Sequence, residues 1–130
     1  MKTLLTASAT LLAFAAPVLA EGDAAKGEKA FRQCKACHSI QAPDGETIVR
    51  GGPVGPNLYG VIGRTAGSVE DFRYSKDLAA KGEEGLVWDE ENIVEYMTDP
   101  SKFIGGRSKM TFKLRKGGED LAAYLATFSE

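Results

Sequence analysis

Five consecutive residues and one distant methionine carry the clearest chemistry in this chain. The segment 34–38 reads C-K-A-C-H, the pattern that attaches a c-type haem. Two thiols three positions apart can reach the two vinyl groups on one edge of a porphyrin, and the next residue then places its imidazole beneath the iron. The pattern therefore predicts one covalent haem c per chain, attached through Cys34 and Cys37, with His38 as an iron ligand.

Two other uses of paired cysteines fit the sequence poorly. A structural zinc ion needs about four protein ligands and a catalytic one about three, whereas the chain has two cysteines and one histidine. A redox-active C-x-x-C pair is expected near a βαβ pattern, which the sequence does not show. That alternative would also leave His38 without a role.

The second axial ligand of the iron has to come from elsewhere in the chain. His38 is the only histidine, so two histidine ligands from one chain are excluded. Met97 lies on an apolar helical stripe, where methionine is usually a core residue. Met110 lies in a polar segment between the glycine pairs 105–106 and 117–118. We therefore expect Met110 as the ligand, with Met97, a lysine or an open position as the alternatives.

The first twenty residues have the pattern of a secretory signal. Lys2 is followed by the uncharged stretch 3–20, which ends in Val18-Leu19-Ala20. Small residues at that end predict cleavage after Ala20 and a single domain over residues 21–130. An uncleaved anchor is the alternative, although the apolar stretch is shorter than the roughly 20 residues that a membrane span needs. The protein is therefore expected in the periplasm, without an integral membrane span after cleavage.

Charge is distributed unevenly over the predicted mature chain. From Asp77 to Asp99 there are eight acidic residues and one basic residue, whereas the range 101–116 has six basic and no acidic residues. We expect a basic surface around the exposed haem edge and the acidic range elsewhere. The predicted basic residues are Lys29, Arg32, Lys35, Lys102, Arg107, Lys109, Lys113 and Lys116. Such a charge dipole would steer encounters with acidic partners; scattered solvated charges are the alternative.

Capping residues and apolar spacing predict an all-α domain with long loops. Asp23, Ser75 and Asp89 can each cap a helix, and the last of these stops before Pro100. A fourth helix is expected from about Glu119, with an apolar stripe at i, i+3, i+4 and i+7. Residues 39–68 are expected to be loop, and no stretch alternates strongly enough to predict a sheet.

Beyond the haem motif, the chain resembles the class I c-type cytochromes, specifically the bacterial cytochrome c2 group, over nearly all of residues 22–129. The resemblance implies the small cytochrome c fold: four or five helices and long loops around one haem, with crossed N- and C-terminal helices. Seven segments in order carry it: C-K-A-C-H-S (34–39), G-P-N-L-Y-G-V-I-G-R-T-A-G (55–67), F-R-Y-S (72–75), W-D-E-E (88–91), Y-M-T-D-P (96–100), K-M-T-F (109–112) and E-D-L-A-A-Y-L (119–125).

The resemblance also implies roles for residues around the haem. Pro56 would accept a hydrogen bond from the His38 ring through its backbone carbonyl, and Tyr96 would point its phenol toward the Met110 sulfur. The residues expected around the haem propionates are Arg64, Tyr74, Trp88 and Ser108. Gly27 and Phe31 would pack against Leu121 and Tyr124 where the first and last helices cross.

These observations predict a monomeric one-electron carrier without nucleic-acid contacts. The resemblance implies a cytochrome bc1 complex as donor and a photosynthetic reaction centre or terminal oxidase as acceptor. A small haem peroxidase or gas-binding sensor is the alternative if Met110 does not ligate iron. A dedicated electron-entry subunit of a periplasmic dehydrogenase is a further alternative.

Overall fold

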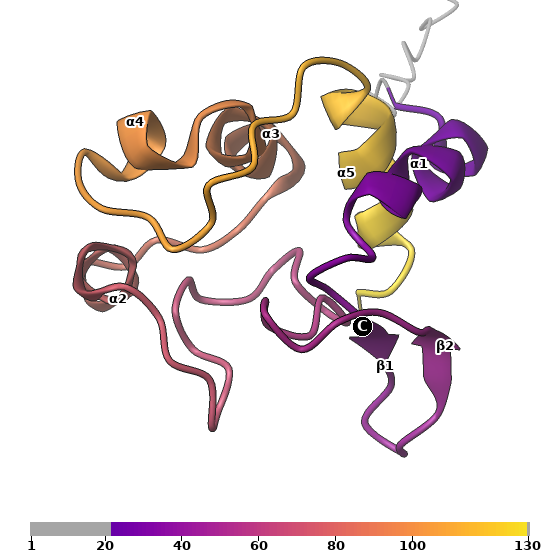
Figure 1. Ribbon diagram of the computed structural model, residues 1–130, viewed down its shortest axis with the longest axis horizontal. Helices are drawn as coiled ribbons and strands as arrows, with labels where there is room; N and C mark the ends of the chain where they lie inside the picture. The colour runs from indigo at the N-terminus through magenta and orange to yellow at the C-terminus, as the bar shows by residue number, and fades with distance from the viewer. Residues whose placement is uncertain (1–21, 130) are drawn as a thin grey trace, which may run out of the picture.

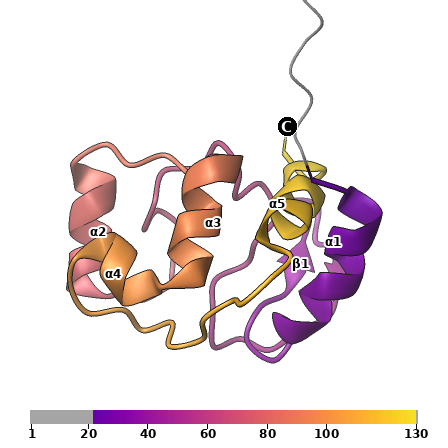
Figure 2. The same cartoon turned by 90° about the horizontal axis from the view of Figure 1, so that it is seen from above.

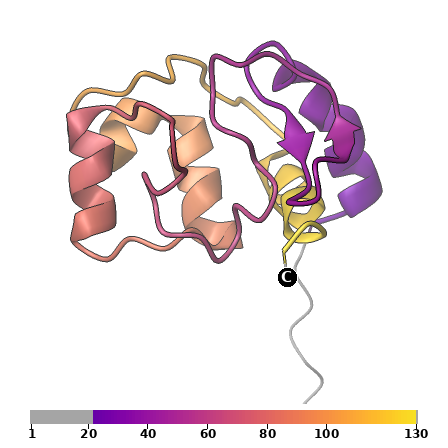
Figure 3. The ribbon, with the colours of Figure 1, turned by 90° about the horizontal axis from the view of Figure 1, so that it is seen from below.

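The computed structural model describes residues 22–129, so the predicted signal sequence over residues 1–20 and its cleavage site lie outside the described residues. Helices α1 and α5 lie at one end of the molecule and α2 and α4 at the other, with α3 between them (Figures 1, 2 and 3). Long loops join the two ends. Among the described residues, no helix is long and apolar enough to cross a membrane.

The four predicted helices are present, and their caps are local. α1 (Ala24–Ala30) begins after Asp23, whose carboxylate accepts from the backbone N–H of Ala25 at 2.9 Å. A 3₁₀ turn, η1 (Phe31–Gln33), extends it toward the haem motif. α2 (Lys76–Glu83) is capped by the Ser75 hydroxyl. α3 (Glu90–Thr98) begins with a capping box between Asp89 and Asn92, and α5 (Gly118–Ala126) follows Gly117.

A further helix, α4 (Pro100–Ile104), lies where no capping signal was recognised. Asp99 is its N-cap and Pro100 occupies its first turn, a position where proline costs no hydrogen bond. Gly105 ends it in a left-handed conformation, with φ of 70°. Pro100 therefore both ends α3 and begins α4, and only the end of α3 was predicted from the sequence.

Residues 40–49 form a small two-stranded sheet, where the sequence analysis predicted only loop. β1 (Ile40–Gln41) pairs antiparallel with β2 (Thr47–Val49) across a turn that contains Pro43, Asp44 and Gly45. Strands of two and three residues are too short to show the alternation that predicts a strand. The hairpin extends a loop and leaves the class all-α.

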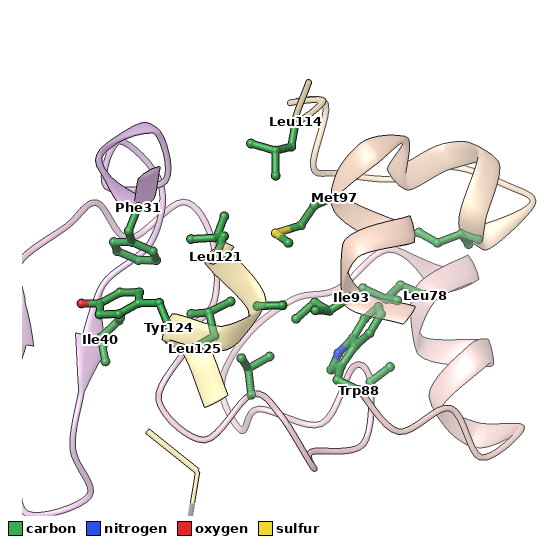
Figure 4. Close-up of a cluster of buried hydrophobic side chains, with 14 residues drawn as sticks. Phe31, Ile40, Leu78, Trp88, Ile93, Met97, Leu114, Leu121, Tyr124 and Leu125 are labelled. Carbon is green, nitrogen blue, oxygen red and sulfur yellow. The ribbon is translucent and has the colours of Figure 1, made fainter. Parts of the chain in front are cut away.

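The crossing of α1 and α5 fixes one end of the core. A Cβ on Gly27 would lie 2.0 Å from the Asp120 carbonyl oxygen, so glycine permits the two backbones to approach closely. The rings of Phe31 and Tyr124 meet beside this contact, with centroids 5.7 Å apart, as the resemblance implied. Figure 4 shows the same core continuing through Leu121 and Leu125 toward α3 and Trp88.

Candidate haem site

The C-x-x-C-H segment forms a tight turn directly after η1. The N–H of Cys37 and that of His38 both donate to the Cys34 carbonyl, at 3.1 and 2.8 Å. Both cysteines are free, and Cys34 is half-buried while Cys37 is exposed. Burial, and secondarily the nearby Cys37, raises the pKa of the Cys34 thiol to about 11. Both cysteines and His38 border one cavity.

Residues Gly55 and Pro56 fix the orientation of the His38 ring. Its Nδ1 lies 2.8 Å from the Pro56 carbonyl oxygen, so an Nδ1–H can donate there and leave Nε2 as the free lone pair. Gly55 lies against the ring face: a Cβ there would be 2.3 Å from Cε1. Burial lowers the pKa of His38 from its usual 6.5, Arg64 lowers it further and the Pro56 contact opposes both, so the imidazole is kept neutral.

The cavity has a volume of about 320 Å³ and a largely apolar wall. Its lining comes from η1 and the haem motif, from helices α2, α3 and α5, and from the segments 54–64, 72–75 and 108–112. All ten predicted site residues border it: Cys34, Cys37, His38, Pro56, Arg64, Tyr74, Trp88, Tyr96, Ser108 and Met110. The structure thus brings together residues that are up to 76 positions apart in the chain.

Met110 lies in a segment without helix or strand, which we call the Met110 strap (residues 105–117). Its backbone N–H donates to the Ser108 hydroxyl at 3.1 Å, and further along the Leu114 N–H donates to the Met97 carbonyl at 2.8 Å. Met97 also borders the cavity, but it is 7% exposed and packs with Ile93 in the core. Met110 is the methionine that no helical stripe explains.

Polar side chains gather at one part of the cavity wall. Arg64 donates to the carbonyls of Asn57 and Tyr59, at 3.0 and 3.2 Å. Burial lowers its pKa, and Tyr74 opposes that change. The backbone N–H of Trp88 donates to the Arg64 carbonyl at 2.9 Å, which joins these two positions. A cluster of donors of this kind can satisfy buried carboxylates, which are costly without partners.

Tyr96 places a half-buried phenol in the cavity wall. Burial raises its pKa above the usual 10, and a hydrogen bond with Ser108 opposes this. Its ring lies 4.9 Å from that of Trp88, centroid to centroid. A half-buried phenol with a nearby hydroxyl partner remains protonated and can donate a hydrogen bond into the cavity.

Several residues of the site carried no sequence signal of their own. Asn57 ties the loop to β1: its side chain accepts from the Gln41 N–H and donates to the Gln41 carbonyl, at 2.9 and 2.8 Å. Val54 and Phe112 border the cavity and are 72% and 40% exposed, which places apolar surface at its mouth. Phe112 is the last residue of the segment K-M-T-F (109–112), and its type and spacing alone do not indicate a role.

The predicted separation of acidic and basic ranges is wrong in part. Asp99 pairs with Lys113 at 3.0 Å, and the Asp77 carboxylate accepts from the Arg107 N–H at 2.6 Å. Two of the eight acids in the range 77–99 therefore lie against the basic strap. Charge along the chain cannot reveal this, because α2 and α4 are neighbours only in the folded protein (Figure 2).

The donor set fits a covalently attached haem. Two thiols and an imidazole with a free Nε2 border the same apolar cavity as a thioether and a group of carboxylate-binding donors. Among residues 22–129, no group of three or more His, Cys, Asp or Glu side chains is placed to hold a metal ion directly. This leaves the zinc alternative without a ligand set in the described chain.

Comparison with known proteins places these features in one family, although no family model matches the chain. Cytochrome c-551 of Roseobacter denitrificans is 60% identical over 122 residues, covering 88% of this chain and 87% of its own. Cytochrome c2 of Rhodobacter capsulatus is 53% identical, and the match covers 98% of each chain.

Solved structures agree with the sequence comparison. The structure of cytochrome c2 from Rhodobacter capsulatus superimposes with a TM-score of 0.81 at 54% identity, covering 82% of this chain and 97% of that one. Ferric cytochrome c-550 from Paracoccus versutus gives 0.82 at 50% identity, covering 85% and 100%. With both its sequence and its fold shared with these proteins, the chain belongs to the bacterial cytochrome c2 group of class I c-type cytochromes, electron-transfer proteins rather than enzymes, which carry one covalent haem c.

Proposed function

We propose that this protein is a periplasmic one-electron shuttle in which His38 and Met110 ligate the haem iron. The observation that supports this most directly is that His38 and Met110 border a single cavity with both haem-binding cysteines. Bound haem supplies the chemistry, a one-electron couple between Fe(III) and Fe(II). A neutral thioether opposite an imidazole raises the reduction potential of such a couple.

The residues around His38 would set its ligand properties. Its hydrogen bond to the Pro56 carbonyl, 2.8 Å long, fixes the tautomer and ring orientation. Such an outer contact also raises the basicity of the ligating nitrogen. Gly55 leaves room for the ring in this orientation.

The polar cluster would hold the haem propionates. Arg64 is already oriented by the carbonyls of Asn57 and Tyr59, and Tyr74, Trp88 and Ser108 border the same cavity. Tyr96, protonated well above neutral pH, would donate toward the Met110 sulfur. These groups would act by positioning and by electrostatics, and none of them would change protonation during electron transfer.

The surface at the cavity mouth would receive the redox partners. Val54 and Phe112 provide exposed apolar contact, and the predicted basic residues would surround them. The proposed donor is a cytochrome bc1 complex and the proposed acceptor is a photosynthetic reaction centre or terminal oxidase. Cleavage after Ala20 would release the protein as a monomer into the periplasm.

The test starts from exported protein purified from a bacterial periplasm. We expect a mass equal to residues 21–130 plus one haem, a pyridine haemochrome typical of two thioether links, and a near-infrared band from Fe(III)–S(Met). Met110→Leu should abolish that band and lower the reduction potential, whereas the matched variant Met97→Leu should keep both. A band that survives Met110→Leu would contradict the assignment of this ligand.

A further inference from the structure

The Met110 strap is fastened to the start of α2 by a side chain that has no part in the site described above. The backbone N–H of Arg107 donates to Oδ2 of Asp77 at 2.6 Å, across 30 residues of sequence. Asp77 is the second residue of α2 and lies in its first turn, which the Ser75 side chain caps. The acceptor, Asp77, therefore belongs to a capped helix, whereas the donor, the Arg107 N–H, belongs to a segment without regular secondary structure.

The residue before Arg107 is a glycine, Gly106, which packs directly against the Asp77 side chain. A Cβ on Gly106 would lie 2.5 Å from Oδ2 of Asp77 and 3.0 Å from its Cβ. Any side chain at position 106 would therefore displace either the strap or the Asp77 carboxylate. Glycine lets the strap lie directly against Asp77.

A second contact joins the same two segments. The Lys109 ammonium group donates to the carbonyl of Arg73 at 2.8 Å. Arg107 and Lys109 thus flank Ser108, and both are tied to residues 73–77. Figure 1 shows the strap, in light orange, passing α2 on its way from α4 to α5. These two hydrogen bonds hold the portion of the strap that precedes Met110 against the first turn of α2 and the residues just before it.

We infer that Asp77 is a positioning residue that holds Met110 in its ligating place. This inference rests on the proposed ligation by Met110. Asp77 does not touch the iron ligands; it acts through the backbone of Arg107, three residues before the methionine. Loss of the Asp77 carboxylate leaves the first half of the strap held by the contact of Lys109 with Arg73 alone, while Leu114 remains anchored to Met97. The expected result is a local opening in which the thioether leaves the iron and the rest of the fold persists.

Imidazole provides a direct probe of this opening. It binds ferric iron only in molecules where Met110 has moved away, so its apparent affinity is the intrinsic affinity multiplied by the open fraction. For Asp77→Ala in the haem-loaded mature protein we expect an affinity about fivefold higher than in the wild type, the effect of losing roughly one charged hydrogen bond at an exposed site.

Two matched variants separate positioning from other effects. Asp77→Asn removes the charge near the α2 N-terminus but keeps an acceptor oxygen, and its imidazole affinity should stay within about twofold of the wild type. Asp44→Ala removes a comparable carboxylate bond, to the Glu46 N–H at 2.9 Å in the hairpin turn, and should leave the affinity unchanged. Faster hydrogen exchange at the Arg107 amide in Asp77→Ala is expected in parallel.

The outcomes distinguish this inference from the proposed ligation. If wild-type protein lacks the Fe(III)–S(Met) band, both are overturned. If the band is present and Asp77→Ala binds imidazole no better than Asp44→Ala, the positioning role alone is overturned. It is also overturned if Asp77→Asn rises as far as Asp77→Ala, because the charge and not the hydrogen bond would then be responsible.

Discussion

Nδ1 of His38 lies 2.8 Å from the carbonyl oxygen of Pro56, and the intervening Gly55 packs on the imidazole face. The loop that orients the ring is itself anchored, because the Gly55 N–H donates to the Cys37 carbonyl at 2.7 Å. The haem-binding turn and the loop at 51–57 therefore form one unit. Its geometry depends on the absence of a side chain at position 55.

Gly55→Ala should damage this unit directly. The added Cβ would lie 2.3 Å from Cε1 and 2.6 Å from Nδ1 of His38, so the ring or the loop has to move. We expect a loss of about 1–3 kcal/mol in the free energy of unfolding, as is typical of overpacking, and a shifted reduction potential. Denaturant unfolding and redox titration of the haem-loaded protein measure the two effects.

Gly45→Ala is the control for that substitution. Gly45 has φ of 92° with open space around it, so alanine there costs stability through backbone conformation alone. Its reduction potential should equal that of the wild type. Equal potentials in both variants would show that Gly55 does not set the His38 orientation.

Gly27→Val should disrupt the crossing of α1 and α5. Its Cβ would lie 2.0 Å from the Asp120 carbonyl oxygen and 2.7 Å from the Tyr124 Cβ, and neither helix backbone can yield without separating the pair. We expect a loss of more than about 3 kcal/mol in stability. The exposed position Ala25 in the same helix is the comparison, where valine should cost about 0.5 kcal/mol from helix propensity. Similar thermal midpoints for the two variants would argue against a close crossing.

Tyr96 predicts a distinct dependence of stability on alkaline pH. Burial raises its folded pKa above the usual 10, so the unfolded chain loses this proton first as pH rises. Stability is therefore fully present below about pH 10 and falls as pH rises through the folded pKa. Tyr96→Phe should show a smaller fall than the wild type in urea unfolding between pH 9.5 and 11.

At pH 8 the phenol is protonated in both the folded and the unfolded wild type, so the stability difference between wild type and Tyr96→Phe at that pH reports only the contacts of the hydroxyl. Deprotonation of lysines affects both proteins equally, so the difference between their pH profiles belongs to the phenol. Parallel profiles throughout the alkaline range would mean that Tyr96 ionises at the same pH in the folded and unfolded chains.

Lys35 is exposed and lies between Cys34 and Cys37 in the sequence, so its charge should influence encounters at the cavity mouth. Electron transfer with a purified cytochrome bc1 complex should slow steeply as ionic strength rises, because salt screens the steering field. Lys35→Glu should lower the second-order rate about tenfold at low salt, and the difference should shrink at high salt. Stopped-flow kinetics over a salt series provide the measurement.

Lys81→Glu is the control for this electrostatic effect. Lys81 is on α2 and pairs with Glu84 at 3.6 Å. Neither of its neighbours, residues 80 and 82, borders the cavity, whereas Cys34 and Ala36 on either side of Lys35 both do. The same charge reversal at Lys81 should change the rate much less. An electron-transfer rate that is independent of salt, or equal losses of rate in the two variants, would argue against docking through the basic residues around the cavity mouth.

Much of this protein could be predicted because the signals are local. The haem pattern depends on the spacing of three residues within one turn, so no tertiary information was needed to recognise it. Asp23, Ser75 and Asp89 cap their helices through hydrogen bonds to residues two or three positions away, which local sequence describes fully. The hairpin at 40–49 and α4 were missed because two- and three-residue strands have no readable period, and because one proline had two roles.

The sequence by itself determined the cofactor and most of the helices and predicted the attachment points, since covalent spacing and capping act over a few residues. Only the tertiary structure placed Arg64, Tyr96 and Ser108 around one cavity with Met110. It also set Asp77 beneath the Arg107 amide and Asp99 against Lys113, contrary to the separation that the linear charge pattern predicted. Such contacts follow from how α2, α4 and the strap pack together, and no property of the segments taken one at a time encodes that packing.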